Sequence, residues 1–357
     1  MSMKYIYVCK SQNFIYTGGI KMVLYKVMND SMRPIHLKIM EGLFNTIQNT
    51  KKRLNNPTEP DYISQLAKDF PDLVNNKLQE YFHNHHIQLK AASVFVHKQP
   101  TVRSTHFSEE KSVEIGDILF IAVHKNKKQI DRWALLLQAK IVNDYLNYYP
   151  ENINQHFLYQ YWPEFEYIRS GNLNGQIRKV QGPGLYSGAK YLLFNPDTAC
   201  RVELCHLFNR PNRMHCLASP HEKLCLIGTA HPTNPLTSFI CLGHEFFNFL
   251  FGNTGREFIY QPKIKNNWDQ VITDLLDETA QRVSKLAQGQ DQHRGYGICF
   301  LRGVPEFITT DQNKAYGLLQ QFGNNDNFYN EQESEKDMPE RGICTIEIVI
   351  DSTDIEE

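Results

Sequence analysis

The chain has 357 residues, of which 41% are hydrophobic and 12% aromatic, and these values exclude a disordered chain. Lys and Arg number 38 against 39 Asp and Glu, so a polycation that coats nucleic acid by bulk charge is excluded. No apolar run is long enough to predict a membrane span, and no signal-peptide pattern is present. The 8 Cys form no dense framework, which indicates reduced thiols. We therefore expect a cytoplasmic protein without membrane contact.

The first part of the chain predicts helices followed by strands. Residues 5–16 and 22–28 predict a hairpin around Gly18-Gly19, and residues 34–51 predict a helix. Between 61 and 85, apolar residues recur at helical spacing, and Pro71 predicts a break between two helices. Apolar runs at 92–96, 113–123 and 133–142 predict strands, the last two joined as a hairpin by a charged turn. Residues 143–149 predict a further helix.

Beyond residue 150 the pattern changes to short aromatic elements at 157–161, 165–168, 191–194, 202–207 and 224–227. Helices are predicted at 239–251 and 268–286, and strands at 297–301 and 343–350, with a polar loop at 324–340. The second helix is amphipathic, and we expect its Trp268, Val271, Leu275 and Val283 face to be buried. We divide the chain into an N-terminal extension (1–60), an α/β core (61–170) and an α+β recognition or partner-binding region (171–357).

Three polar residues interrupt the two apolar strands of the predicted hairpin. Asp117 lies in the first strand, and Gln138 and Lys140 lie two residues apart in the second, so these two side chains share a face. A lysine in an apolar strand is costly without a partner, and Asp117 is a suitable partner. We therefore expect a carboxylate, an amide oxygen and an ammonium group to meet at one point, in a cleft.

This combination suits the hydrolysis of phosphodiesters. Carboxylate and carbonyl oxygens are hard ligands that hold Mg²⁺, and Mn²⁺ can substitute for it. Such an ion polarises the phosphate and activates a water molecule, while an ammonium group stabilises the developing negative charge. Asp117 and Gln138 are the candidate ligands, and Lys140 is the candidate catalytic cation. The alternative is that Asp117 begins a strand and Lys140 ends one, with each side chain in solvent.

The order of these elements resembles the PD-(D/E)xK superfamily of restriction-endonuclease-like nucleases. An acid-containing helix, a strand, the Asp117 strand, a polar turn and the Gln138-Ala-Lys140 strand follow one another. The Gln-x-Lys form is similar to Mrr-type restriction enzymes and to some anti-phage effectors. The resemblance covers about residues 62–165 and implies a mixed sheet flanked by helices. It departs from the family pattern at Gly116, where a proline often stands, and at Gln138, where an acid is usual.

The resemblance also implies a further acid from the preceding helix, and Glu80 is the candidate for this metal ligand. Glu114 competes with Glu80, although it lies on the opposite face of its strand from Asp117, and Glu109 and Glu110 are weaker candidates. Tyr159 and Gln160 either line the site or pack in the core. Lys125, Lys127, Lys128 and Arg132, together with Arg103, are candidate phosphate contacts at the cleft or the hairpin turn. A solvated turn is the alternative for these basic residues.

Other motifs give weaker signals. Cys200, Cys205, Cys216 and Cys225, with His206, His215 and His221, suggest zinc, but the spacing contains no CxxC pair and core or surface positions are the default. His244-Glu245 lacks the second His of HExxH, and the segment around Gly182 lacks GK[ST], so neither a metalloprotease nor a phosphate loop is predicted.

The expected function is that of a metal-dependent endonuclease that hydrolyses DNA, in restriction or anti-phage defence by analogy with the family. DNA is the expected partner, and a protein partner or homo-oligomer is left open. A first rival is a catalytically degenerate nuclease fold that binds nucleic acid or assembles a complex, which Gln138 favours. A second rival is an interaction or inhibitor protein whose aromatic C-terminal half is the functional part.

Overall fold

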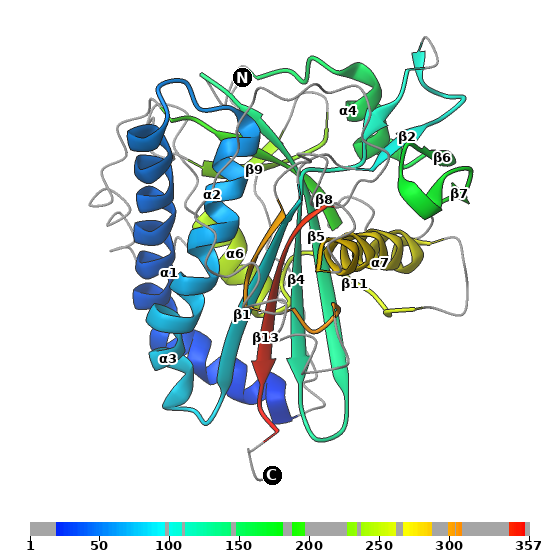
Figure 1. Cartoon of the computed structure of the whole chain (residues 1–357). Helices are drawn as coiled ribbons and strands as arrows, with labels where there is room; N and C mark the ends of the chain where they lie inside the picture. Colours follow the sequence, from blue (N-terminus) through cyan, green and yellow to red (C-terminus); the bar gives the residue numbers. More distant parts are fainter. Residues whose placement is uncertain are drawn as a thin grey trace, which may run out of the picture.

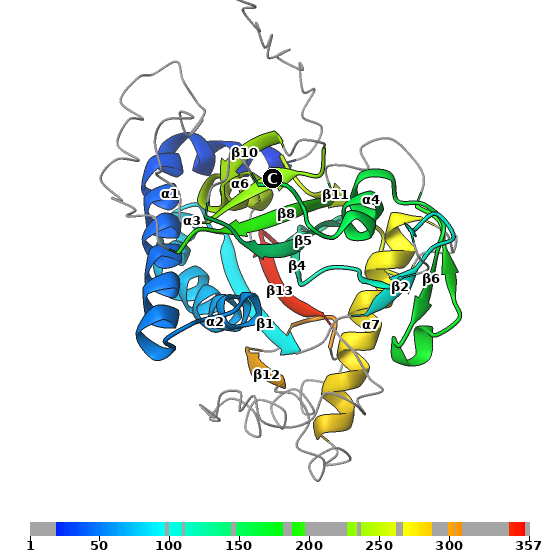
Figure 2. The same cartoon turned by 90° about the horizontal axis from the view of Figure 1, so that it is seen from above.

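A large mixed sheet divides the molecule into two layers (Figures 1 and 2). The computed structural model describes residues 19–96, 100–108, 111–143, 148–180, 188–196, 227–233, 237–261, 267–287, 299–303, 305–308 and 343–353. The helices are α1 (Gly19–Arg53), α2 (Glu59–Asp72), the π-helix η1 (Leu73–Leu78), α3 (Gln79–His83), α4 (Ile153–Tyr161), the 3-10 helix η3 (Gly171–Leu173), α6 (Leu242–Leu250) and α7 (Trp268–Ala287). Among these, no helix combines the length and the apolar character that crossing a bilayer requires.

The strands form two sheets. They are β1 (Gln88–Val96), β2 (Thr101–Arg103), β3 (Val113–Glu114), β4 (Ile118–Lys125), β5 (Ile130–Ile141), β6 (Phe165–Ile168), β7 (Ile177–Arg178), β8 (Ala189–Phe194), β9 (Ile227–His231), β10 (Thr237–Cys241), β11 (Arg256–Glu257), β12 (Cys299–Arg302) and β13 (Cys344–Asp351). The large sheet has the order β10-β9-β8-β5-β4-β13-β1-β12, with β11 beside β5, and the small sheet has the order β3-β2-β6-β7. The expected α/β class, with a mixed sheet flanked by helices, is confirmed.

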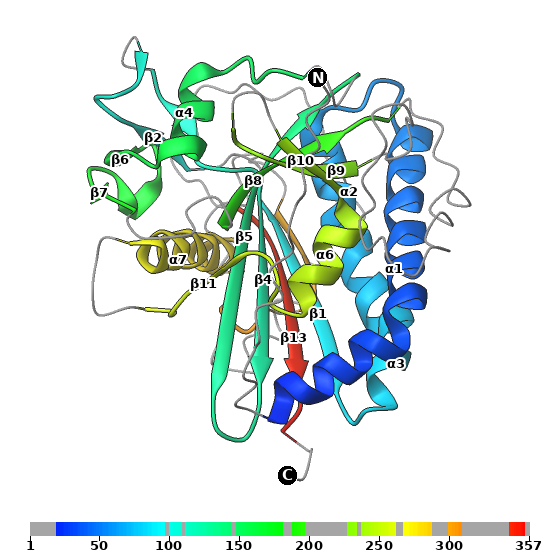
Figure 3. The ribbon, with the colours of Figure 1, turned by 180° about the vertical axis from the view of Figure 1, so that it is seen from behind.

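Each face of the large sheet has its own apolar core. Residues such as Phe120 and Leu137 pack under α1, α2, α3 and α6, and α6 lies beside α1 when the molecule is seen from behind (Figure 3). The alternate residues, such as Leu119 and Leu136, pack under α4, α7 and the small sheet. This alternation follows from the two-residue period of a strand. Trp268, Val271, Leu275 and Val283 of α7 are all buried, as expected.

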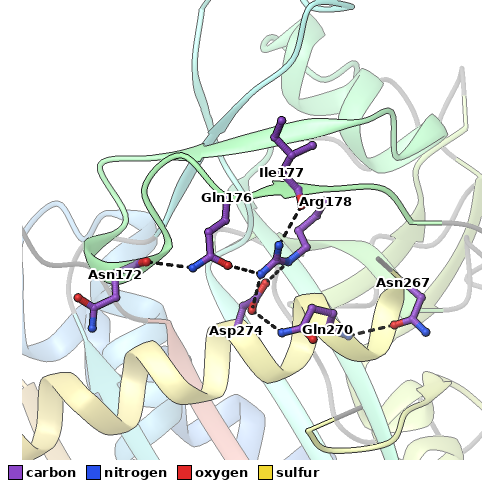
Figure 4. A network of polar contacts seen from close by, with 7 residues as sticks. All are labelled: Asn172, Gln176, Ile177, Arg178, Asn267, Gln270 and Asp274. Carbon is purple, nitrogen blue, oxygen red and sulfur yellow. Dashed lines mark hydrogen bonds and ion pairs between the residues drawn. The ribbon is translucent and has the colours of Figure 1, made fainter. Parts of the chain in front are cut away.

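Arg178 and Asp274 join the small sheet to α7. The guanidinium Nε donates to Asp274 Oδ2 at 2.7 Å and Nη2 donates to Oδ1 at 3.1 Å, and both side chains are buried. Figure 4 shows Gln176 beside the same guanidinium and Gln270 on the same carboxylate. A buried ion pair stabilises the structure only when its remaining polar atoms have partners, and this network supplies them. The helix α7 is therefore fixed against one edge of the small sheet.

The helical region before β1 differs from the sequence-based expectation at two points. Residues 22–28, expected as a strand, belong to the helix α1, whose buried Val27, Ile35 and Ile39 follow helical spacing; residues 1–18 lie outside the described part. Pro71 does not end a helix, because α2 continues directly into η1 and α3. Proline cannot donate to the carbonyl four residues earlier. That carbonyl, on Ala67, accepts a hydrogen bond from the Ser93 hydroxyl instead.

The π-helix η1 and the start of α3 close part of the edge of β1. Where β1 extends beyond its pairing with β12, Asn75 Oδ1 accepts from the Ala91 N–H at 2.7 Å and Asn75 Nδ2 donates to its carbonyl at 2.9 Å. In the same way, Gln79 Oε1 accepts from the Leu89 N–H and Gln79 Nε2 donates to the Ile87 carbonyl. These two amide side chains therefore replace part of a neighbouring strand.

The predicted hairpin of β4 and β5 forms the centre of the large sheet. It is antiparallel, with Ile118 opposite Leu137 and Lys125 opposite Ile130. The segment expected as one strand at 113–123 is divided, because the chain bends at 115–117 between β3 and β4. After β5 the chain passes through α4 and returns as β8, which is parallel to β5. Residues 148–150 are not helical, and the short aromatic element at 157–161 is part of α4.

The strand β13 lies between β4 and β1, parallel to β4 and antiparallel to β1. Strands from residues 61–170 and from residues 171–357 therefore share one sheet, and a boundary at residue 170 runs through it. The expected strands at 297–301 and 343–350 correspond to β12 and β13, and the expected helix at 239–251 corresponds to α6. The short aromatic elements at 165–168 and 191–194 are the strands β6 and β8. The expected strand at 202–207 and the loop at 324–340 lie outside the described residues.

Candidate active site

Asp117 and Gln138 face each other where β4 begins and β5 nears its end. The Asp117 N–H donates to the Leu137 carbonyl at 2.9 Å, which continues the ladder of the hairpin. The carboxylate oxygen Asp117 Oδ2 accepts from the side-chain amide of Gln138 and from the Ala139 N–H. Both side chains are buried, at 6% and 1% exposed. The expectation that the two strands bring a carboxylate and an amide together therefore holds in the geometry.

Gln155 of α4 holds the other end of the Gln138 amide. Its Nε2 donates to Gln138 Oε1 at 2.6 Å and to the Glu114 carbonyl at 3.3 Å. The helix begins at this point because the Asn152 side chain accepts a hydrogen bond from the Gln155 N–H, which caps the first turn. A chain of three side chains, from Asp117 through Gln138 to Gln155, thus crosses the buried end of the hairpin.

Lys140 reaches a different carboxylate. Its Nζ donates to Glu59 Oε2 at 3.1 Å, while Glu59 Oε1 accepts from the Ile141 N–H at 3.1 Å. Glu59 is the first residue of α2, where an acidic side chain is favoured by the helix dipole. The pair is about one quarter to one third exposed, so it borders solvent. The acid that pairs with the lysine is therefore Glu59, and not Asp117 as expected.

Gly116, the residue that departs from the family pattern, allows α4 to approach the hairpin. A Cβ at this position would lie 2.7 Å from Leu136 Cδ1 and 2.9 Å from the Tyr159 hydroxyl. That hydroxyl donates to the Ile115 carbonyl at 2.9 Å, and Tyr159 is fully buried. Tyr159 therefore supports the bend before Asp117 from within the core. Among the described residues, Gln160 makes no hydrogen bond to Asp117, Gln138 or Lys140.

The Asp117 carboxyl is held in an unfavourable place for a negative charge. Burial and the nearby charge of Glu114 raise its pKa to about 8, although the charge of Lys140 and the Ala139 hydrogen bond act in the opposite direction. Glu59 adds a smaller contribution that also raises this pKa. Carboxyl groups with raised pKa values are common at functional sites, because their burial is tolerated for the chemistry they perform. The carboxylates of Glu114 and Glu59 near Asp117 would favour a bound cation, because both of their charges act on the Asp117 carboxyl.

A pocket of about 350 Å³ opens beside these residues. Lys140, Glu59, Glu114 and Gln155 line it, together with Tyr148 and Glu151. Glu114 reaches the pocket although strand alternation places it opposite Asp117, because the bend at 115–117 ends the alternation. The candidate site is thus a polar pocket with three carboxylates and one ammonium group at its wall. We call it the hairpin-end pocket.

The acid Glu80 is not part of this pocket. It is exposed on α3, and α2, η1 and α3 run consecutively from Glu59 toward the opposite end of the sheet (Figure 1). Twenty-one residues of helix separate the two acids, which corresponds to roughly 30 Å. Glu80 therefore contacts neither Asp117 nor Lys140, and it lies beside Tyr81 instead. Glu109 and Glu110 lie outside the described residues.

The basic residues of the hairpin turn are also distant from the pocket. Lys125 ends β4, eight positions from Asp117, which corresponds to roughly 25 Å along a strand. Its Nζ forms an ion pair with Glu306, and Lys127 and Lys128 are exposed in the turn. Arg132 is half-buried near the start of β5, and Arg103 forms an ion pair with Glu166. Phosphate contacts at the turn would therefore be separate from the hairpin-end pocket.

Two residues of the site, Glu59 and Gln155, were missed by sequence reasoning. Glu59 precedes the apolar repeat of α2, and it meets Lys140 across 81 positions of the chain, so no local pattern indicates the contact. Gln155 had a signal, because Asn152 is a preferred helix N-cap three residues before it. The candidate zinc residues between 200 and 225 lie outside the described residues, as does the segment around Gly182.

The donor set fits a hard divalent cation in part. Asp117, Glu59 and Glu114 offer carboxylate oxygens of the kind that Mg²⁺ prefers. Asp117 Oδ1 receives no hydrogen bond from any residue that the structure describes. Gln138 Oε1 is occupied by Gln155 in this conformation. Among the described residues, no cluster of three His, Cys, Asp or Glu side chains is already arranged to hold a metal ion. No protein family, curated protein or solved structure matches the chain.

Proposed function

We propose that the protein is a metal-dependent endonuclease that hydrolyses DNA phosphodiester bonds at the hairpin-end pocket. The observation that supports this proposal is the convergence of Asp117, Gln138 and Lys140 at one end of β4 and β5. The buried Asp117 carboxyl, whose pKa is raised, bonds the Gln138 amide, and Gln155, which holds the other end of that amide, lines the open polar pocket together with Lys140. This is the arrangement that the resemblance to PD-(D/E)xK nucleases implies for these positions.

Each residue has a role that follows from its contacts. Asp117 and Glu59 would hold Mg²⁺ through carboxylate oxygens, with Gln138 joining them after its amide oxygen leaves Gln155. Bound Mg²⁺ polarises the phosphate and lowers the pKa of a coordinated water. Lys140 has three N–H donors and gives one to Glu59, so others can stabilise the negative charge that develops on the phosphate oxygens. Gln155 and Tyr159 keep the hairpin end in position.

The wider setting of the proposal rests on analogy alone. The Gln-x-Lys form suggests restriction or anti-phage defence in the cytoplasm, and no contact in the structure addresses that role. The βαβ passage from β5 through α4 to β8 places a helix over the candidate residues, which agrees with a restriction-endonuclease-like core. DNA is proposed as substrate because the pocket wall carries ligands suited to a phosphodiester and its metal ion.

A plasmid-nicking assay with purified protein tests the proposal. We expect conversion of supercoiled DNA to open-circle and linear forms with Mg²⁺ or Mn²⁺, and none with a chelator. Asp117→Ala should abolish this conversion, and Lys140→Ala should reduce it by orders of magnitude. Asp131→Ala is the matched control, because Asp131 belongs to the turn end of the same hairpin. Equal activity of Asp117→Ala and wild type would exclude this site.

One observation favours a second candidate function, a nuclease fold that binds nucleic acid without cleaving it. Both ends of the Gln138 amide have protein partners, because its nitrogen donates to Asp117 and its oxygen accepts from Gln155. A site of this kind holds together without a metal ion. DNA binding by the wild type that is unchanged by a chelator, together with no cleavage under any divalent cation, would favour this candidate.

A further inference from the structure

A second pocket lies at the part of β1 that extends beyond β12. It has a volume of about 640 Å³ and shares no lining residue with the hairpin-end pocket. Ala92 and Val349 form apolar parts of its wall on the face of the sheet that carries Glu347, and Glu347 and Glu306 bring carboxylates. We call it the β1-edge pocket. Its volume is within the range of small-molecule sites in proteins.

Glu347 is the unusual group in this pocket. It lies on the central strand β13, is only 4% exposed, and its Oε2 accepts the backbone N–H of Glu306 at 2.5 Å. Within the described residues, Glu347 has no ion-pair partner, and it has no further hydrogen bond. A buried carboxylate normally has a cation or several donors, because its desolvation is otherwise costly. One oxygen of Glu347 is therefore left without a donor at the wall of an open pocket.

Among the described residues, the neighbouring cations Lys90, Lys125 and Arg132 form no ion pair or hydrogen bond with Glu347. Lys125 and Arg132 act on Glu347 through their charges, but the ammonium group of Lys125 forms its ion pair with Glu306. The Asn75 and Gln79 amides, which also line the pocket, are bonded to the backbone of β1. As far as the described residues show, the position beside Glu347 is thus open to a further donor.

We propose that the β1-edge pocket binds a small organic cation, whose ammonium or guanidinium group pairs with Glu347 and whose alkyl part lies on Ala92 and Val349. A cation of this class supplies both the charge and the N–H donors that the carboxylate lacks. The apolar wall selects a ligand with an alkyl chain over a bare inorganic ion. The proposal does not depend on nuclease activity, because the two pockets are separate.

Titration calorimetry with butylguanidinium and its neutral isostere butylurea tests this proposal. We expect saturable binding of butylguanidinium at pH 8.5 and at least about tenfold weaker binding of butylurea, because a charge-assisted hydrogen bond is lost. Glu347→Gln should reduce butylguanidinium affinity at least about tenfold. Glu80→Gln is the matched control, since Glu80 is an exposed acid of α3, the helix that contributes Gln79 and His83 to the pocket, and does not itself line it; it should change the affinity less than threefold.

The pH dependence of wild-type binding keeps the test decisive if Glu347→Gln fails to fold. Burial is the main reason that the pKa of Glu347 is raised to about 7, and the Glu306 charge adds to it while Lys125 and Arg132 oppose it. Affinity should therefore fall about tenfold between pH 8.5 and pH 6 as the carboxyl binds a proton. His83 and Lys90 also line the pocket. If the affinity of the His83→Gln variant falls by the same factor over this pH range, the pH dependence belongs to Glu347 and not to His83. Equal binding of the two probes, equal losses in the two Glu variants, or no saturable binding would overturn the proposal.

Discussion

Glu59 and Lys140 form an ion pair at 3.1 Å between the first residue of α2 and the penultimate residue of β5. The same carboxylate accepts the Ile141 N–H, so the start of α2 is attached to the end of the candidate strand. The orientation of the Lys140 ammonium group therefore depends on α2, which packs on the face of the large sheet opposite the face that α4 covers. This relationship makes Glu59, and not Glu80, the acid whose removal should affect the site.

Glu59→Gln should reduce metal-dependent cleavage at least tenfold, because it removes one candidate ligand charge and the ion-pair partner of Lys140. Glu80→Gln is the matched control on the same helical segment, and it should leave cleavage within about twofold of wild type. The nicking rate and the Mg²⁺ concentration at half-maximal rate measure both effects. A larger loss in Glu80→Gln than in Glu59→Gln would contradict the assignment.

Asp117→Asn should stabilise the metal-free protein at alkaline pH. The pKa of this carboxyl is about 8 in the folded chain and about 3.9 in an unfolded chain. A raised folded-state pKa contributes stability that is complete below about pH 4 and is lost as the pH rises through 8. Asparagine carries no such charge, so the gain at pH 9 should be on the order of a few kcal/mol and should disappear near pH 4.

Chemical unfolding with a chelator present, at pH 4.5, 7 and 9, measures this difference. Asp131→Asn is the control, because Asp131 is near the turn and is not fully buried. A gain that is equal at all three pH values would show that Asp117 does not titrate as described.

Gln138→Glu should couple stability to metal ions. Without metal, a second carboxyl opposite the buried Asp117 replaces an N–H donor, so two acids compete for one proton and the fold loses about 1–3 kcal/mol. With Mg²⁺, the added charge should tighten metal binding, and cleavage should equal or exceed that of wild type. Thermal unfolding with and without Mg²⁺ measures the coupling. A variant that is destabilised equally in both conditions would count against a metal site.

Gln155→Ala should lower cleavage about tenfold while leaving DNA binding unchanged. The substitution removes the donor that fixes Gln138 Oε1 and leaves that buried oxygen without its partner. Gln160→Ala is the control, because Gln160 belongs to the same helix without a bond to Gln138. Cleavage rate and DNA affinity, measured separately, distinguish a local effect from a loss of fold. Equal rates for the two variants would remove Gln155 from the site.

The sequence predicted the parts of the site that depend on local pattern. Strand alternation placed Gln138 and Lys140 on one face, and the apolar runs gave the hairpin that brings Asp117 opposite Gln138. It did not predict the Glu59 contact, because that contact depends on how α2 packs across the sheet. Residues 22–28 were assigned to a strand because a short apolar run has no period of its own, and only packing shows that it extends α1.

The placement of β13 also decides which truncations are informative. Removing everything after about residue 150, which would isolate the aromatic half from the nuclease-like half, takes away the strand between β1 and β4. Both of those strands would then present bare edges, and the remaining chain would be prone to aggregate. Loss of activity in such a fragment would say nothing about which half is functional, so point variants are the better test.

The central position of β13 has a further consequence for the order of events during synthesis. A ribosome completes β4 and β5 more than 200 residues before it reaches Cys344, so the hairpin with Asp117 and Lys140 exists while its inner neighbour is still missing. Pairings over such sequence distances form slowly, because a long loop must close first. The nascent chain therefore keeps a gap in the middle of its sheet until β13 has been synthesised. The hairpin that carries Asp117 and Lys140 is thus enclosed on its inner side only by a strand made more than 200 residues later.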